Sequence, residues 1–414
     1  MSEHLSSLQA EVGGLLADAD AALAARYPGS RGDRQPVHTV YVPADRVTPA
    51  TPGQWSAQAL AALQEHAPDD EGLATAFGTP AELAESIRRK IVAKLTAEPI
   101  EDLRVDFEDG YGRRPDAEED ADADRASATI AELLGSPGGP LRCGIRFACL
   151  EAATRDRGLR TLDRVVGGLG GRVPAGFVLT LPKVTSVEQV SAMVRICERL
   201  EAVHRLPAGA LRFEIQVETP QAILSADGVA TVAPMIHAAA GRCSALHYGT
   251  YDYSASVGIA AEYQSMEHPA ADHAKNVMQV AAAGTGVELS DGSTNIVPVG
   301  DADQVVAAWQ LHSRLVRRHL ERGYYQGWDL HPAQLPSRYA AVYGFYLAGL
   351  SRATTRLRSY LQRADSGFMD EPATALALAG FVLRAVDCGA VDGPSAAEVA
   401  GTDELGLRRL ARRP

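Results

Sequence analysis

Hydrophobic and polar residues alternate along the chain in two patterns that succeed one another. Eight short runs rich in β-branched and aromatic residues, each ended by turn residues, predict β-strands; they begin at residues 37, 102, 141, 176, 211, 243, 286 and 326. The stretches between them carry a 3.6-residue hydrophobic period that predicts helices, most clearly at 80–97, 186–203, 273–284 and 303–323. Eight alternations of strand and helix predict an α/β fold, a (β/α)8 TIM barrel.

The two ends of the chain differ from this alternating region. Residues 1–36 predict an N-terminal helix followed by a linker, "PGSRGDRQP", and the pattern from 336 to 414 is purely helical. We therefore expect a catalytic barrel at 37–335 with a helical segment on each side. An open, doubly wound sheet is the alternative architecture, but no G-x-G-x-x-G turn follows the first predicted strand, which weakens a dinucleotide-binding interpretation.

Composition narrows the classes of partner. A chain with 46% hydrophobic and 22% charged residues is typical of a globular protein. The formal net charge of -12 leaves no basic face for nucleic acid or for an anionic membrane surface. The five cysteines are scattered and form no C-x-x-C pair, and no signal peptide or long apolar run is found. The expectation is a cytoplasmic protein that binds neither nucleic acid nor membrane.

Polar residues recur where the predicted strands end. Catalytic groups of a TIM barrel lie at the C-terminal ends of its strands. A single acid at such a place is more often a helix cap or a loop residue, so the recurrence matters more than any one position. The strand-end residues are Asp106, Glu108, Asp109, Arg146, Lys183, Glu218, Asp252 and His331.

Two carboxylates from adjacent predicted strands suit a metal ion. In "RFEIQVET" the alternation puts Phe213, Ile215 and Val217 on one face and Glu218 on the other, toward the barrel mouth. Asp252 follows the next strand. Without histidine or cysteine nearby, such oxygens favour Mg²⁺ or Mn²⁺ over zinc. A pair of ordinary strand-end acids remains open as the alternative.

The motifs "VYVPADR", "VDFEDGYG", "GIRF", "LPKV", "VETPQAI", "GTYDYSASVGI" and "GWDLHPAQL" occur in this order. Over about residues 37–336 the chain resembles the HpcH/HpaI aldolase and citrate lyase beta-subunit family, of the phosphoenolpyruvate/pyruvate-type TIM barrel superfamily. The resemblance implies a barrel that binds Mg²⁺ and makes or breaks a carbon–carbon bond beside a 2-oxo acid or acyl-CoA carbonyl. By motif match, Glu218 and Asp252 are the implied metal ligands, and Arg146 binds substrate and stabilises an enolate.

The remaining strand-end residues receive provisional roles on this basis. Asp106, Glu108 and Asp109 are expected to hydrogen-bond metal-bound water, and one of them to move a proton. Lys183 pairs with these acids or forms a Schiff base. His331 is either a base or a structural hydrogen-bonding residue.

Several features leave the substrate open. Arg46 in "PADR" contacts either a coenzyme A phosphate or a surface acid. Where the family usually has R-V-N this chain has "IRFA", the glycine that often follows the E-T step is replaced in "ETPQAI", and residues 262–300 form a longer segment than usual. These departures flank the expected substrate pocket, so they affect the choice of substrate more than the metal.

The expected function is a Mg-dependent carbon–carbon lyase or aldolase that acts on a hydroxyacyl-CoA, of malyl, citramalyl or citryl type, or on a 2-oxo acid aldol. An acyl-CoA thioesterase, a phosphoenolpyruvate-utilising transferase and a non-catalytic metabolite-binding protein are the alternatives. The apolar stretch "YAAVYGFYLAGL" after Leu335 predicts a covered helix. It either packs on its own barrel or, as relatives suggest, completes the site of a neighbour in a homo-oligomer, a trimer or a multiple of one.

Overall fold

Eight parallel strands form the centre of the molecule. The structure is a computed structural model that describes residues 3–362 and 371–413. Each strand lies within one of the eight predicted runs: β1 (His38–Pro43), β2 (Asp102–Asp106), β3 (Arg142–Arg146), β4 (Phe177–Leu181), β5 (Phe213–Val217), β6 (Cys243–Tyr248), β7 (Glu288–Ser290) and β8 (Gly327–Asp329). Their order in the sheet is β7-β6-β5-β4-β3-β2-β1-β8.

The sheet closes into a barrel through its two ends. β8 pairs in parallel with β1, with His38 opposite Gly327. β7 and β8 meet through a single bridge between Ser290 and Gln326, supported by a hydrogen bond from the Asp291 amide to the Gln326 carbonyl (2.9 Å). The predicted TIM barrel is therefore confirmed, with its weakest seam between the two shortest strands.

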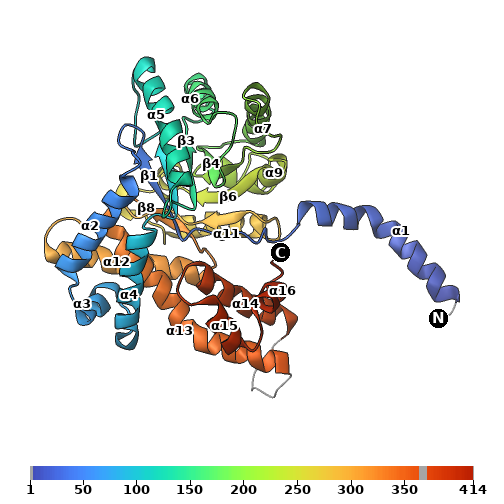
Figure 1. The fold of residues 1–414 in the computed structure, drawn as a ribbon. Helices are drawn as coiled ribbons and strands as arrows, with labels where there is room; N and C mark the ends of the chain where they lie inside the picture. Colours follow the sequence, from blue (N-terminus) through green and yellow to red (C-terminus); the bar gives the residue numbers. More distant parts are fainter. Residues whose placement is uncertain (1–2, 363–370, 414) are drawn as a thin grey trace.

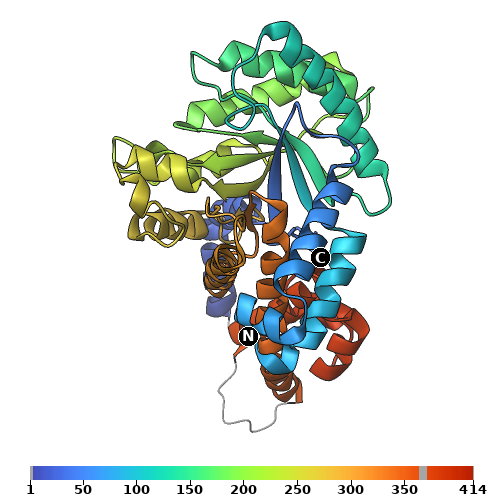
Figure 2. The ribbon, with the colours of Figure 1, turned by 90° about the vertical axis from the view of Figure 1, so that its left-hand side faces the viewer.

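Helices surround the barrel (Figures 1 and 2), and the four clearest predictions correspond to α4, α7, α11 and α12. α11 begins four residues before its predicted start because Pro269 occupies its first turn and the His268 side chain caps it. The helices are α1 (Glu3–Arg26), α2 (Thr51–His66), α3 (Asp70–Phe77), α4 (Ala81–Ala97), α5 (Asp116–Gly135), α6 (Arg155–Gly168), α7 (Val187–Val203), α8 (Pro220–Ile223), α9 (Val232–Ala238), α10 (Thr250–Ser256), α11 (Pro269–Ala282), α12 (Ala302–Glu321), α13 (Leu335–Gln362), α14 (Pro372–Asp387), α15 (Gly393–Ala400) and α16 (Glu404–Leu410). No helix within the described residues is long and apolar enough to span a lipid bilayer.

The linker after α1 covers the N-terminal end of the barrel. The Arg31 guanidinium donates to the Cys243 carbonyl at the start of β6 (2.9 Å), and Gln35 Nε2 donates to the Leu289 carbonyl in β7 (3.0 Å). Arg34 pairs with the buried Glu101 (2.6 Å), just before β2. These contacts leave the C-terminal ends of the strands as the open mouth of the barrel.

A buried ion pair fills the barrel interior. The Arg104 guanidinium, which is fully buried, donates to both carboxylate oxygens of Glu214 (3.1 and 2.7 Å) and also pairs with Asp102. Thr180 donates its hydroxyl to the same Glu214 (2.6 Å). Because each charge has a close partner, the lumen below the mouth is a packed polar core rather than a channel.

The C-terminal helices pack on the chain's own barrel. α13 lies against α12, α4 and α14, and its Tyr339, Tyr343 and Tyr346 are buried. In both ribbon views α13–α16 lie together, at the opposite end of the molecule from α5–α7 (Figures 1 and 2). The stretch "YAAVYGFYLAGL" is thus already covered within the chain. Residues 363–370 and 414 of the predicted C-terminal segment lie outside the described residues.

Asp329 at the end of β8 anchors α13 to the barrel. It is fully buried and accepts hydrogen bonds from Arg338 Nη2 of α13 (2.7 Å) and from His38 Nδ1 of β1 (3.0 Å). The His38 tautomer follows from its other nitrogen, because Nε2 accepts the Glu101 amide (3.1 Å). One carboxylate therefore joins two strands and a helix.

Replacing Asp329 with asparagine should destabilise the protein by roughly 3–5 kcal/mol, because the buried Arg338 charge would lose its counterion. Urea unfolding of Asp329→Asn, followed by circular dichroism, measures this loss. Glu321→Gln is the matched control, since the exposed Arg317–Glu321 pair (3.3 Å) contributes at most about 0.5 kcal/mol. Equal midpoints for the two variants would contradict the anchoring role.

Candidate active site

Arg146 and Asp106 form a bidentate ion pair at the barrel mouth. They end the neighbouring strands β3 and β2 and stand opposite each other in the register. Arg146 Nε and Nη2 each donate to one Asp106 oxygen, both at 2.7 Å. The same two oxygens accept the amides of Glu108 (3.0 Å) and Gly110 (2.9 Å). Asp106 therefore holds both the guanidinium plane and the turn that follows β2.

Two aromatic rings form the floor beneath this ion pair. The Arg146 guanidinium carbon lies 4.7 Å from the ring centre of Tyr41 in β1 and 5.6 Å from that of Trp328 in β8. Sequence reasoning missed both rings. The period-2 alternation was the available signal, since Asp329 and Gly327 face the outer helices and leave Trp328 facing the lumen.

Lys183 gathers the remaining acids of the mouth. Its ammonium lies 2.7 Å from Glu108 Oε1, 2.7 Å from Asp109 Oδ1 and 3.7 Å from Asp252 Oδ1. Glu108 and Asp109 follow β2, and Asp252 lies in the first turn of α10 after β6, so the lysine joins two sides of the mouth. The Lys183 backbone has a φ of +49°, a left-handed conformation that costs a non-glycine residue about 1–2 kcal/mol.

Glu218 is the buried acid of the cluster, with only 1% of its surface exposed. Its Oε1 accepts the Lys183 amide (2.8 Å) and its Oε2 accepts Gln216 Nε2 (2.6 Å). Burial, with the negative charges of Asp252 and Glu108 nearby, raises the pKa of Glu218 to about 8. The structure thus brings Glu218 and Asp252 together, as their adjacent strands predicted.

The donor set suits a hydrated magnesium ion. Glu218 is a buried carboxylate beside other acids, so a cation would relieve the unfavourable burial of its charge. Glu108 Oε2 is also buried and has no hydrogen-bond partner. The described residues contain no cluster of three or more histidine, cysteine or acidic side chains arranged as a metal cage. Mg²⁺ needs only one or two protein carboxylates, because it retains several waters.

His331 and Arg46 are placed apart from this cluster. His331 Nδ1 accepts the Ala333 amide (3.1 Å) and so caps the short 3-10 helix η2 (Pro332–Gln334). Arg46 lies on the loop after β1 and is exposed. In the part of the chain that the structure describes, neither side chain forms a hydrogen bond or ion pair with Glu108, Asp109 or Lys183.

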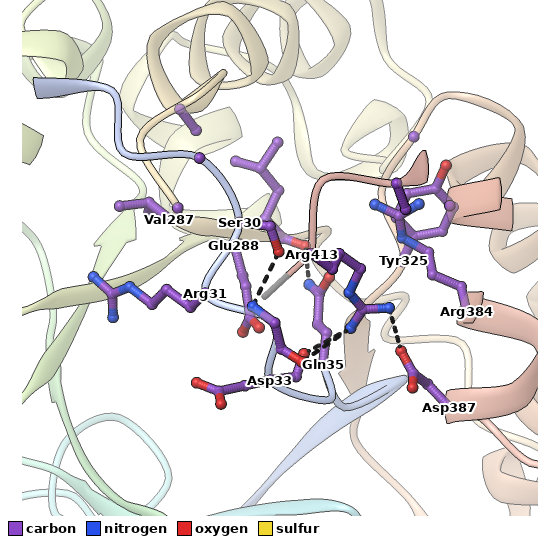
Figure 3. A pocket seen from close by; sticks show the side chains of 18 of the residues that line it. Ser30, Arg31, Asp33, Gln35, Val287, Glu288, Tyr325, Arg384, Asp387 and Arg413 are labelled. Carbon is purple, nitrogen blue, oxygen red and sulfur yellow. Dashed lines mark hydrogen bonds and ion pairs between the residues drawn. The ribbon is translucent and has the colours of Figure 1, made fainter. Parts of the chain in front are cut away.

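A cavity of about 340 Å³ lies at the opposite end of the barrel, between the linker and α14 (Figure 3). Arg413 pairs there with Asp387 (2.7 Å) and donates to the Asp33 carbonyl (3.0 Å), while Arg384 stacks on Tyr325 (4.0 Å). None of the residues that line this cavity belongs to the mouth cluster. We regard it as part of the closure of the N-terminal end.

A family model described as a domain of unknown function, DUF6986, matches residues 16–413. The chain belongs to the DUF6986 family. No curated protein sequence matches this DUF6986 protein. Its fold, however, recurs in solved structures.

A citrate lyase from Burkholderia xenovorans LB400 superposes with a TM-score of 0.55 and 22% identity, over 75% of this chain and 91% of that one. A Haloferax volcanii malate synthase in complex with magnesium and glyoxylate gives 0.50 and 15%, over 92% and 99%. The CitE protein of Mycobacterium tuberculosis, in complex with magnesium, acetoacetate and coenzyme A, gives 0.48 and 18%, over 83% and 97%. The DUF6986 protein thus shares the fold of the first two structures.

Gly249→Ala should disturb the cluster directly. A methyl group at Gly249, just after β6, would lie 2.5 Å from both Cβ and Oε2 of Glu218, so strands β5 and β6 must separate locally. We expect a loss of about 1–3 kcal/mol from this overpacking. Gly53→Ala in α2 is the control, since nothing lies within 4 Å of its added methyl and alanine favours a helix. The melting temperature should fall for Gly249→Ala only. Equal melting temperatures for the two variants would contradict the packing argument.

Proposed function

We propose that this protein is a Mg²⁺-dependent carbon–carbon lyase or aldolase that acts on a hydroxyacyl-CoA or on a 2-oxo acid aldol. The observation that carries the proposal is the placement of the Arg146 fork and the Glu218–Asp252 pair at one barrel mouth. A fixed guanidinium, and a magnesium ion held by the carboxylates, would together complement an anionic substrate that gains further negative charge during reaction.

Glu218 and Asp252 would hold the magnesium ion. When bound, the ion supplies Lewis-acid polarisation of a substrate carbonyl. Lys183 contributes a fixed positive charge beside Asp252, and its ammonium also pairs with Glu108 and Asp109. An ammonium committed to two carboxylates is unsuited to a Schiff base, because imine formation needs a neutral amine.

Arg146 would bind the substrate carboxylate and stabilise the developing enolate. Asp106 occupies Nε and Nη2, and the third nitrogen, Nη1, lies 3.5 Å from Glu108 and 3.9 Å from Asp109. The guanidinium cannot lose its proton, and its position is set before substrate arrives, so no reorganisation is required as charge develops. Asp106 is thereby a positioning residue.

Glu108 is the acid to which we assign the proton transfer. Its Oε2 is buried, forms no hydrogen bond and contacts Arg146 Nη1 at 3.5 Å, whereas Asp106 is committed to Arg146 and Asp109 is half exposed. Burial, with Asp109 adjacent, raises the pKa of Glu108 above its usual range despite Arg146 and Lys183. A carboxyl group shifted toward neutral pH can both accept and return a proton.

The fold is compatible with this assignment. A citrate lyase and a malate synthase bound to magnesium and glyoxylate have the same barrel. Since one barrel fold hosts many chemistries, the support rests on the residues of the mouth.

Glu218→Gln should abolish magnesium binding and most activity while the fold is retained, because a mouth ligand is not a core packing residue. Isothermal titration with MgCl₂ measures the first effect. Product analysis on a panel of hydroxyacyl-CoA thioesters and 2-oxo acid aldols measures the second, and Glu262→Gln, an exposed acid, is the control. Cleavage yields two carbonyl products, hydrolysis yields a free thiol, and a binding protein yields neither. Full activity after exhaustive chelation would overturn the proposal.

Arg146→Lys keeps the positive charge but loses the planar fork, so turnover should fall by about a hundredfold or more. The comparison is Arg160→Lys, whose guanidinium is half exposed and pairs with Asp116 and Asp120 on the surface. Steady-state rates with saturating magnesium provide the measurement. An unchanged rate in the Arg146 variant would place enolate stabilisation on another residue.

A further inference from the structure

Helix α1 extends away from the rest of the molecule (Figure 1). Six of its large apolar side chains are exposed, up to 76% for Leu15, and no heavy atom lies within 4 Å of the methyl groups that Gly13 and Gly14 would carry as alanines. The exposed residues are Leu5, Leu8, Val12, Leu15, Leu16 and Leu23. Such a face has no partner among the residues that the structure describes.

These side chains form one continuous stripe. At 3.6 residues per turn, all six fall within an arc of about 120°. Positions 5, 8, 12, 15, 19 and 22, with alanine at the last two, repeat at alternating intervals of three and four residues. This spacing is the a and d seam of a coiled coil, in which each apolar residue packs between residues of another helix.

The helix requires a partner for its own stability. Its two central glycines each cost about 1 kcal/mol relative to alanine in a helix interior. Helices in proteins gain most of their stability from packing an apolar face, which α1 does not do against the other described elements.

Charge indicates which partner fits. α1 carries four acidic residues and a single arginine, whereas helices that lie on membranes carry lysine and arginine on the polar face. The alternating three- and four-residue spacing of the apolar positions is that of a helix that packs against a copy of itself. In an antiparallel pair, Glu11 and Asp18 at the flanking g positions would meet the same acids of the other copy. In a parallel pair they would face Leu16 and Leu23 at the e positions, which avoids the repulsion.

We propose that α1 forms a parallel coiled coil with α1 of a second copy of this chain. The base of the helix is held on the barrel, where Tyr27 packs edge-on against His237 (5.6 Å) and the Gly29 amide donates to the Gly284 carbonyl (2.8 Å). Gly284 precedes β7, so pairing joins the N-terminal ends of two barrels and leaves both mouths open. The assembly is independent of the proposed enzyme activity.

Full-length variants measured by sedimentation velocity test the seam. Leu8→Glu with Leu15→Glu places two charges in the stripe and should lower the particle mass, at least halving it where α1 alone joins the copies. Ala10→Glu with Ala17→Glu adds the same charges on the opposite, exposed face and should leave the mass unchanged. The proposal is overturned if the wild type and the seam variant have equal masses, which includes the case in which both are monomers. It is also overturned if the control variant dissociates.

A cysteine substitution tests the orientation. The described native cysteines are all buried, so a Leu5→Cys chain presents one accessible thiol in this region. Parallel pairing brings residue 5 beside its own copy, and mild oxidation should give a covalent dimer on a non-reducing gel. Cross-linking only when Ala22→Cys is added indicates an antiparallel pair and overturns the orientation. Flotation of a monomeric chain with anionic vesicles, lost in the seam variant, overturns the proposal in favour of a membrane surface.

Discussion

Buried charge that must be compensated governs this barrel from the lumen to the mouth. Arg104 inside the barrel is matched by Glu214 and Asp102, and Asp329 on the outer face is matched by Arg338 and His38. Each set joins elements that are distant in sequence, so the strands and helices hold one another through ion pairs as well as apolar packing. Glu218 is the exception, because its closest charged neighbours include other acids. An acid that burial and its neighbours both disfavour is a sign of a functional position rather than of stability.

The two ends of the barrel are covered by different kinds of contact. Linker residues and the C-terminal tail close the N-terminal end, where Arg413 reaches the backbone of the linker and Arg31 reaches β6. At the other end, Lys183 in a strained backbone conformation pairs with acids from the loop after β2 and from α10. Strain is tolerated where the surroundings determine a conformation, and here the Glu218 carboxylate accepts the strained residue's amide. The contacts that close the barrel and the acid cluster around Glu218 therefore lie at opposite ends of the barrel axis.

Helices α1 and α13 differ in how their apolar side chains are covered. Both were predicted as helices, and both carry more apolar residues than a solvated helix needs. The tyrosines of α13 are buried against neighbouring helices, whereas the leucines of α1 are exposed in the described part of the chain. An apolar stripe predicts that a helix will be covered, and only the tertiary structure identifies which helix remains without a partner.

Local periodicity determined the eight strands, the main helices, the barrel and the inward direction of Glu218, because alternation along a strand depends only on near neighbours. The strand-end positions of Asp106 and Arg146 follow from the same pattern, whereas Asp252, expected at a strand end, lies in the first turn of α10. Only the tertiary structure decided that Asp106 is committed to Arg146, 40 residues away, and that Tyr41 and Trp328 lie beneath the guanidinium. It likewise decided that His331 caps a short helix and that Lys183 joins the loop after β2 to α10. These outcomes depend on strand register, barrel closure and side-chain direction, which set distances between residues that the sequence separates.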